Sequence, residues 1–176
     1  MAQMVADSSS LILLAKCSLL EIVCCLFEVF VPTAVVVEVA SEDLIKNHPD
    51  AALISELISK GAMTVQNPGS DEFLSSQSLH KGEKEAIELA IKRSGALLAT
   101  DDGKAIKAAR FLKVPFVITP KIVTELFRLQ KISLKKAHGS LEKLAKIGRY
   151  SPEIIADALV SLMEEKDDKT DNHKDT

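Results

Sequence analysis

Residues 96–102 read ALLATDD, a short apolar run that stops at two adjacent acids, Asp101 and Asp102. Residues 4–9 read MVADSS, in which a similar run stops at Asp7. Short apolar runs that end in polar residues indicate buried strands. Each run is followed by residues that can begin a helix. The chain therefore predicts buried strands alternating with helices.

The same alternation continues along the chain. Three further apolar runs, at residues 28–31, 63–65 and 114–118, also predict strands. Helices are expected from Leu11 after the cap residues Ser8–Ser10, and over 18–26, 32–38, 49–60, 82–95, 103–111, 120–130, 133–147 and 151–163. This order predicts a three-layer α/β/α fold with a central, mostly parallel sheet of four to five strands, plus trailing C-terminal helices.

Length and composition agree with one domain over residues 1–163. The chain has 176 residues, of which 47% are hydrophobic and only 4% aromatic, so its core must be aliphatic. Residues 164–176 hold six acids and three lysines, and we expect them to form a disordered charged tail. The rest of the chain is then neutral, which argues against a globally basic nucleic-acid binder but allows a local basic patch.

Neither cysteines nor apolar segments suggest an exported or membrane protein. Cys17, Cys24 and Cys25 are odd in number and have no nearby histidine, so we expect buried free thiols rather than disulfides or a zinc site. The apolar stretch 11–30 is interrupted by Lys16, Glu21 and Glu28 and lacks a basic leader. We expect a soluble cytoplasmic protein without a membrane partner.

The positions of five carboxylates indicate the chemistry of a candidate site. The carboxyl ends of parallel strands are where ligands gather, and Asp7, Asp101 and Asp102 stand there. Glu38 and Glu83 lie in segments expected to be helical. Carboxylates brought together repel each other unless a cation lies between them. Because the set has oxygen donors and neither His nor Cys, it points to Mg²⁺ or Mn²⁺ and to phosphodiester chemistry.

Each acid also has a purely structural interpretation. Asp7 or Ser9 could serve only as a helix N-cap, and Glu38 could be a charge at the edge of an apolar helix. Glu83 could simply complement the dipole of its helix. One of the two acids at 101–102 could cap the following helix while the other faces the site.

Two further sets of charged residues lie close to these acids in the sequence. Glu85 and Glu88 are expected on the solvated face of their helix. Lys104, Lys107 and Arg110 repeat every three residues after Asp102 and could contact phosphates, although a solvated basic face is the common alternative.

Four short motifs follow one another along the chain: VADSS at 5–9, PTAVVVEV at 32–39, GEKEAIELA at 82–90 and LATDD at 98–102. In this order they resemble the motifs of PIN-domain proteins, and the resemblance covers about residues 4–150. No single motif is specific without the others. The family comprises metal-dependent ribonucleases and includes the VapC-type toxins of prokaryotic toxin–antitoxin pairs. The Gly-Glu form of the third motif resembles a prokaryotic subgroup of small PIN proteins.

The resemblance implies roles for the acids. Asp7 and Glu38 would be catalytic metal ligands, directly or through water, and Glu83 would fill the third acidic position, which is more often Asp in the toxins. Asp102 matches the fourth acid, with the adjacent Asp101 as the alternative. Ser9 matches a small hydroxyl residue that supports the site.

The function expected is that of a Mg²⁺- or Mn²⁺-dependent endoribonuclease acting on single-stranded or loop RNA. The resemblance further implies a homodimer and a possible antitoxin protein as partner. A catalytically weak RNA- or protein-binding module on the same fold is the alternative. A phosphoacceptor receiver domain fits poorly, because it needs two acids after the first strand, where this chain has Asp7 followed by serines.

Overall fold

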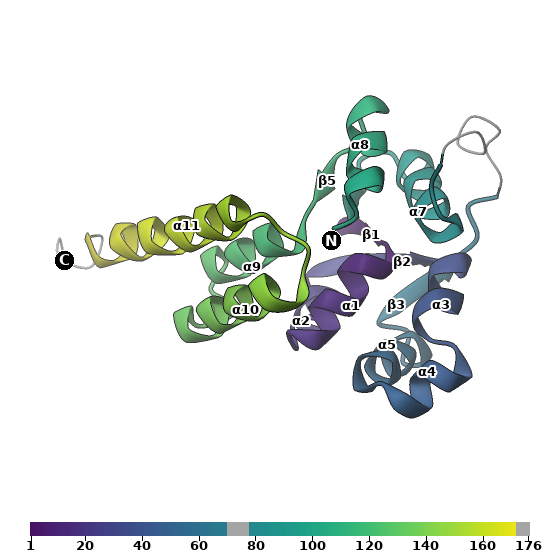
Figure 1. Cartoon of the computed structure of the whole chain (residues 1–176), viewed down its shortest axis with the longest axis horizontal. Helices are drawn as coiled ribbons and strands as arrows, with labels where there is room; N and C mark the ends of the chain where they lie inside the picture. Colours follow the sequence, from purple (N-terminus) through teal and green to yellow (C-terminus); the bar gives the residue numbers. More distant parts are fainter. Residues whose placement is uncertain (70–77, 172–176) are drawn as a thin grey trace. The chain divides into compact units, whose positions relative to one another are not determined.

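The computed structural model describes residues 1–69 and 78–171 of the chain. The chain forms two compact units, Met1–Ile118 and Thr119–Thr176. In Figure 1 the first unit runs from purple to green and the second from green to yellow. A single domain over residues 1–163 would include parts of both units, and it stays a prediction.

The first unit is built on a parallel sheet, as expected. Its described part has five strands in the order β3-β2-β1-β4-β5, and every neighbouring pair is parallel. The prediction of a mostly parallel sheet of four to five strands is confirmed. The strands are β1 (Ala2–Ala6), β2 (Phe27–Pro32), β3 (Met63–Gln66), β4 (Leu97–Ala99) and β5 (Phe116–Val117).

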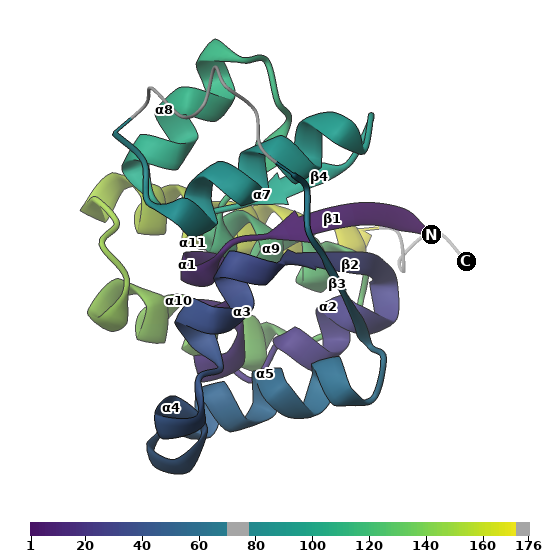
Figure 2. The ribbon, with the colours of Figure 1, turned by 90° about the vertical axis from the view of Figure 1, so that its right-hand side faces the viewer.

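Helices cover both faces of this sheet (Figure 2). Helices α7 and α8 lie on one face, and α2 and α5 on the other. The helices described in this unit are α1 (Ser8–Lys16), α2 (Leu20–Leu26), α3 (Thr33–Val39), α4 (Glu42–Asn47), α5 (Pro49–Ser59), α7 (Lys81–Lys92) and α8 (Gly103–Phe111). This arrangement confirms the predicted three-layer α/β/α fold.

Strand order decides where a ligand can bind. The chain runs from β1 through β2 to β3 on one side, then crosses to β4 and β5 on the other side of β1. In open parallel sheets a crevice forms outside the carboxyl ends of the strands where the order reverses. Here those ends belong to β1 and β4, which Asp7 and residues 100–102 directly follow.

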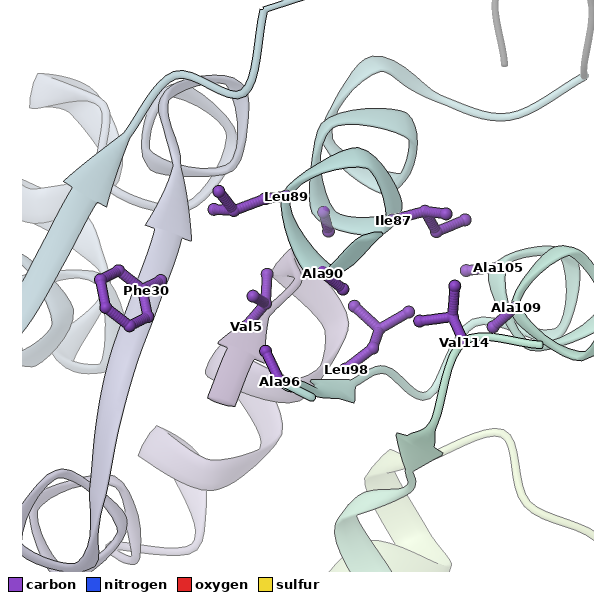
Figure 3. Packing of buried hydrophobic residues seen from close by; sticks show 11 residues of the cluster. Val5, Phe30, Ile87, Leu89, Ala90, Ala96, Leu98, Ala105, Ala109 and Val114 are labelled. Carbon is purple, nitrogen blue, oxygen red and sulfur yellow. The ribbon is translucent and has the colours of Figure 1, made fainter. Parts of the chain in front are cut away.

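Short aliphatic side chains fill the space between the sheet and α7 and α8 (Figure 3). Val5 pairs in register with Phe30 on one side and with Leu98 on the other, so all three point to the same face. Ile87 of α7 is fully buried against them. Burying a side chain of this size contributes about 1.5–3 kcal/mol to stability. The cluster is mostly aliphatic, as the composition predicted.

The expected start of the helix after the first acid is wrong, and one short helix was not predicted. Helix α1 begins at Ser8 rather than at Leu11, and its N-cap is Asp7, whose side chain accepts from the Ser10 backbone N–H. Residues 8–10 are therefore inside the helix, because Asp7 is itself a preferred cap residue. The short helix α4 had no counterpart in the sequence prediction.

The expectation that Glu85 and Glu88 lie on a solvated face of α7 is also wrong. Glu88 is only 7% exposed. Glu85 is half-buried, and its carboxylate accepts the backbone N–H of Ala34 at 2.8 Å. Ala34 is in the first turn of α3, where backbone N–H groups have no partner within the helix. Helix α7 thereby holds the start of the helix that carries Glu38.

The second unit consists of α9 (Thr119–Arg128), α10 (Leu134–Ile147) and α11 (Pro152–Asp171), which pack pairwise on one another. Leu126, Leu141 and Leu162, one from each helix, are buried. Helix α11 was expected to end at residue 163 and to be followed by disorder. It continues to Asp171, because Glu and Lys favour helix even after the last buried residue. Residues 172–176 lie outside the described residues.

In the described part of the chain, no single helix is long and apolar enough to cross a membrane. Helices α1 and α2 would meet the length and hydropathy requirement only as a pair, with a bend of 114° between them. The cysteines are free, as expected, but only Cys17 is buried, whereas Cys24 is half-buried and Cys25 is exposed.

Candidate metal-binding active site

Asp7 is the buried centre of the site. It follows β1 and is 2% exposed. Its Oδ1 accepts the Ser9 hydroxyl at 2.7 Å and the Ser10 backbone N–H at 2.9 Å. Its Oδ2 accepts the hydroxyl of Thr100, which follows the neighbouring strand β4. The carboxylate is therefore fixed from two strand ends at once.

Burial raises the pKa of Asp7 from 3.8 to about 6, because the charged form loses hydration. The hydrogen bonds from Ser10, Thr100 and Ser9 lower this pKa and offset part of the effect, while the nearby charge of Asp101 raises it further. A buried carboxylate in this state gains from a cation placed beside it.

Glu38 reaches the same place from α3. Its Oε2 accepts the hydroxyl of Ser8, in the first turn of α1. Its Oε1 accepts the backbone N–H of Gly82 at 3.0 Å, in the first turn of α7. Although the Glu38 side chain is exposed, these two contacts hold its carboxylate between two helix starts.

Glu83 and His80 form a reciprocal cap at the start of α7. The Glu83 carboxylate accepts the His80 backbone N–H at 2.9 Å, and the His80 side chain accepts the Glu83 backbone N–H. The ring of His80 has a second nitrogen besides the one in this cap, and that nitrogen can form a further hydrogen bond.

The two adjacent acids after β4 have different positions. Asp102 is the N-cap of α8, and its Oδ1 accepts the backbone N–H groups of Lys104 at 2.7 Å and Ala105 at 3.0 Å. The backbone N–H of Asp101 donates to the Ser9 hydroxyl at 2.8 Å. Ser9 thus links the Asp7 carboxylate to the segment after β4.

These elements surround one cavity of about 450 Å³. It contains four of the five acids predicted from the sequence, and Asp102 rather than Asp101 is the one that lines it. The lining residues are Asp7, Ser8, Ser9, Ile12, Glu38, His80, Glu83 and Asp102.

The donor set fits a hard divalent cation in its chemistry. Four carboxylates face the cavity, and among the described residues that line it none is Lys or Arg. Within residues 1–69 and 78–171, however, no three Asp, Glu, His or Cys side chains are close enough to enclose an ion. The carboxylates instead bind neighbouring hydroxyl and backbone N–H groups. They would have to turn inward to hold a metal.

Sequence reasoning missed several residues at this site. Ser8, Thr100 and Gly82 bind the acids, and His80 lines the cavity. His80 stands three residues before Glu83, the spacing of a helix capping box, which is a usable signal. Thr100 was noted only as the end of a strand. Its role depends on strand order, which no local pattern reveals.

The predicted RNA-contacting residues lie along α8. Lys104 and Lys107 are exposed. Arg110 is also exposed, and its guanidinium lies 5.5 Å from the ring centroid of Phe116. The helix that carries them begins at the cavity, because its N-cap is Asp102.

The chain matches a family model described as a PIN domain over residues 3–165, which include the whole cavity and most of the chain. A search of curated proteins finds no match.

Proposed function

Because the chain belongs to the PIN-domain family, we propose that it is a divalent-metal-dependent endoribonuclease whose active site is this cavity. The observation that carries the proposal is the convergence of Asp7, Glu38, Glu83 and Asp102 on one cavity. These acids come from four different elements, and no Lys or Arg neutralises them among the described residues that line it.

Asp7, Glu38, Glu83 and Asp102 would hold Mg²⁺ or Mn²⁺. When bound, such an ion makes water a better nucleophile and stabilises negative charge on phosphoryl oxygens. Ser9, Ser10 and Thr100 fix both oxygens of Asp7 by hydrogen bonds, so a metal would have to share an oxygen with one of these donors. Glu83 would first have to leave its hydrogen bond to the His80 backbone.

His80 would orient the substrate. One ring nitrogen of His80 takes part in the cap, and the other belongs to a side chain that lines the cavity and would donate an N–H to a ligand there. A phosphate oxygen is an acceptor, so this donor can fix a scissile phosphate beside the carboxylates without adding a competing charge. We propose this positioning role in addition to the cap that His80 gives α7.

The substrate would be single-stranded or looped RNA. A single strand or loop can bend to bring one phosphodiester into a compact cavity, whereas the backbone of an A-form duplex is held in a regular helix. Lys104, Lys107 and Arg110 on α8 would contact phosphates on either side of the scissile bond. Such contacts give affinity without base specificity.

A catalytically weak RNA- or protein-binding module is the second candidate. One observation favours it: the carboxylates are engaged in local hydrogen bonds, and Glu83 in particular forms part of a helix cap. If those bonds persist when Mg²⁺ is added, the cavity will not assemble a catalytic centre.

Calorimetric titration with Mn²⁺ and Mg²⁺ separates these candidates when it is paired with an RNA cleavage assay. We expect metal binding that is weakened in Glu38→Gln and unchanged in Glu142→Gln, an exposed acid on α10. Binding together with cleavage supports the nuclease. Binding without cleavage supports the module, and no binding contradicts the metal site.

A finer proposal is that the chain acts as a toxin within a toxin–antitoxin pair, as a homodimer silenced by an antitoxin protein. This proposal rests on family membership alone. Induced expression tests it: growth arrest with the wild-type chain, and none with Asp7→Asn at equal protein level, is the expected result.

A further inference from the structure

The two long faces of α8 differ sharply in chemistry. Ala105 and Ala109 are almost fully buried and pack against the core that Figure 3 shows, beside Ile87 and Val114. Their small side chains let the helix lie close to its neighbours. This face anchors α8 in the first unit.

The opposite face carries Lys104, Lys107 and Phe111, which we call the α8 stripe. Their spacing of three and seven residues places them on one side of a helix. All three are exposed, and Phe111 is 75% exposed. Because this aromatic ring is so open to water, its burial by a binding partner would still release most of its hydrophobic free energy.

The stripe starts beside the proposed active site. Asp102 lines the cavity and caps α8, and Lys104 is two residues further along. At 1.5 Å per residue, Phe111 lies about 10 Å beyond Lys104 along the helix axis. A strand that leaves the cavity along α8 would meet the lysines first and the aromatic ring last.

The charge of the helix favours a polyanion. Residues 103–111 include three basic residues and no acid. Proteins that hold single-stranded nucleic acid combine basic side chains for the phosphates with aromatic rings on which bases stack. Lysine and phenylalanine on one exposed face supply both groups.

We infer that the α8 stripe is a binding track for single-stranded RNA. Lys104 and Lys107 contact phosphates, and Phe111 stacks on an unpaired base a few nucleotides from the scissile bond. The inference rests on the proposed function for the position of that bond, but binding itself does not require catalysis. Arg110 lies at the edge of the stripe, 5.5 Å from the Phe116 ring centroid, and would add a phosphate contact beside the track.

Fluorescence anisotropy with a labelled single-stranded RNA, in EDTA to prevent cleavage, tests the track. Phe111→Ala should weaken binding by about fivefold to a hundredfold, whereas Phe111→Trp should retain affinity. The double variant Lys104→Ala/Lys107→Ala should reduce the slope of log affinity against log salt by about 1.4. The charge-matched control Lys60→Ala/Lys131→Ala, at two exposed lysines elsewhere, should leave the slope unchanged.

The outcomes separate this inference from the proposed function. If the wild type binds RNA but never cleaves it with Mg²⁺ or Mn²⁺, the nuclease proposal fails, and loss of binding in Phe111→Ala still supports the track. If the wild type cleaves RNA and Phe111→Ala binds and cleaves equally well, the track alone is wrong. Wild-type protein that does not bind RNA in EDTA overturns the track, and cleavage with Mg²⁺ or Mn²⁺ then decides the nuclease proposal by itself.

Light scattering on the same samples tests whether Phe111 instead forms a contact between copies of the protein. If Phe111→Ala changes the mass of the assembly and each subunit still binds RNA as tightly, the ring is a contact between protein copies. That result would overturn the track.

Discussion

The backbone N–H of Gly82 donates to Glu38 Oε1 at 3.0 Å, and a methyl group on Gly82 would lie only 2.5 Å from Glu38 Oε2. The two residues are 44 positions apart. Glycine at position 82 is therefore what lets the Glu38 carboxylate lie against the start of α7.

Gly82→Ala should reduce activity more than stability. The clash is with the far end of a flexible side chain, so Glu38 can swing away while the fold remains. Alanine also favours a helix over glycine by up to about 1 kcal/mol. We expect an unchanged or higher melting temperature, with weaker Mn²⁺ binding and slower RNA cleavage.

Gly139→Ala is the matched control, because a methyl group there meets no atom within 4 Å. It should leave cleavage unchanged. Full activity in Gly82→Ala would show that the observed Glu38 position is not needed.

Glu85 is predicted to support the site from a distance. Removing its carboxylate in Glu85→Ala leaves the Ala34 N–H at the start of α3 without its partner. The cost should be about 1 kcal/mol in unfolding free energy, with slower cleavage because α3 carries Glu38. Glu85→Gln keeps an acceptor and should restore most of both losses.

Urea denaturation and cleavage rates measure these two effects. Glu56→Ala, which removes an exposed ion pair with Lys60, is the comparison and should cost less than about 0.5 kcal/mol. Equal losses of unfolding free energy in Glu85→Ala and Glu56→Ala would show that Glu85 does not stabilise the start of α3.

The raised pKa of Asp7 makes stability depend on pH. The folded chain holds the Asp7 proton up to about pH 6, whereas the unfolded chain releases it near pH 3.8. The resulting stabilisation is complete below pH 3.8 and is lost as the pH rises through 6. As the pH rises from 4 to 7 in metal-free buffer, the unfolding free energy of Asp7→Asn should therefore increase relative to that of the wild type by roughly 1–3 kcal/mol.

Urea denaturation of both proteins in EDTA at several pH values measures this gain, and other carboxyl groups cancel in the difference. Added Mn²⁺ should stabilise the wild type more at pH 7 than at pH 5, because a metal needs ionised Asp7. A difference between the two proteins that does not change with pH would contradict the burial effect.

His80 can be tested for its two roles separately. In His80→Ser one hydroxyl oxygen would accept the Glu83 N–H and also carry the side chain's single donor, whereas His80→Asn has an acceptor oxygen and a separate amide donor. We expect both variants to fold as stably as the wild type, and the Ser variant to cleave more slowly than the Asn variant. If His80→Ser cleaves RNA at the wild-type rate, His80 serves only as a helix cap.

The sequence predicted the strands and most helices because these depend on local patterns. Runs such as residues 4–6 and 96–100 are short and apolar, and α7 has a clear helical period. The acids at the ends of β1 and β4 followed from the same runs. The choice between Asp101 and Asp102 needed the structure, since both stand after the same strand.

The supporting contacts could not be predicted, because they join distant residues. Thr100 donates to Asp7 across 93 positions, and Glu85 caps Ala34 across 51. Thr100 has only the pattern of a residue that ends a buried strand, and Glu85 has that of a residue on a solvated helix face. The strand order that brings Asp7 beside Thr100 is set by packing of the whole sheet, not by any single run.

The most direct test of the central claim is single-turnover cleavage of a mixed single-stranded RNA pool by purified protein, with Mg²⁺, with Mn²⁺ and with EDTA. The wild type should cleave only with a metal. Asp7→Asn should be slower by on the order of a thousandfold or more, while Asp157→Asn, at an exposed acid on α11, should match the wild type. Equal metal-dependent cleavage by Asp7→Asn would show that the nuclease site is not this cavity.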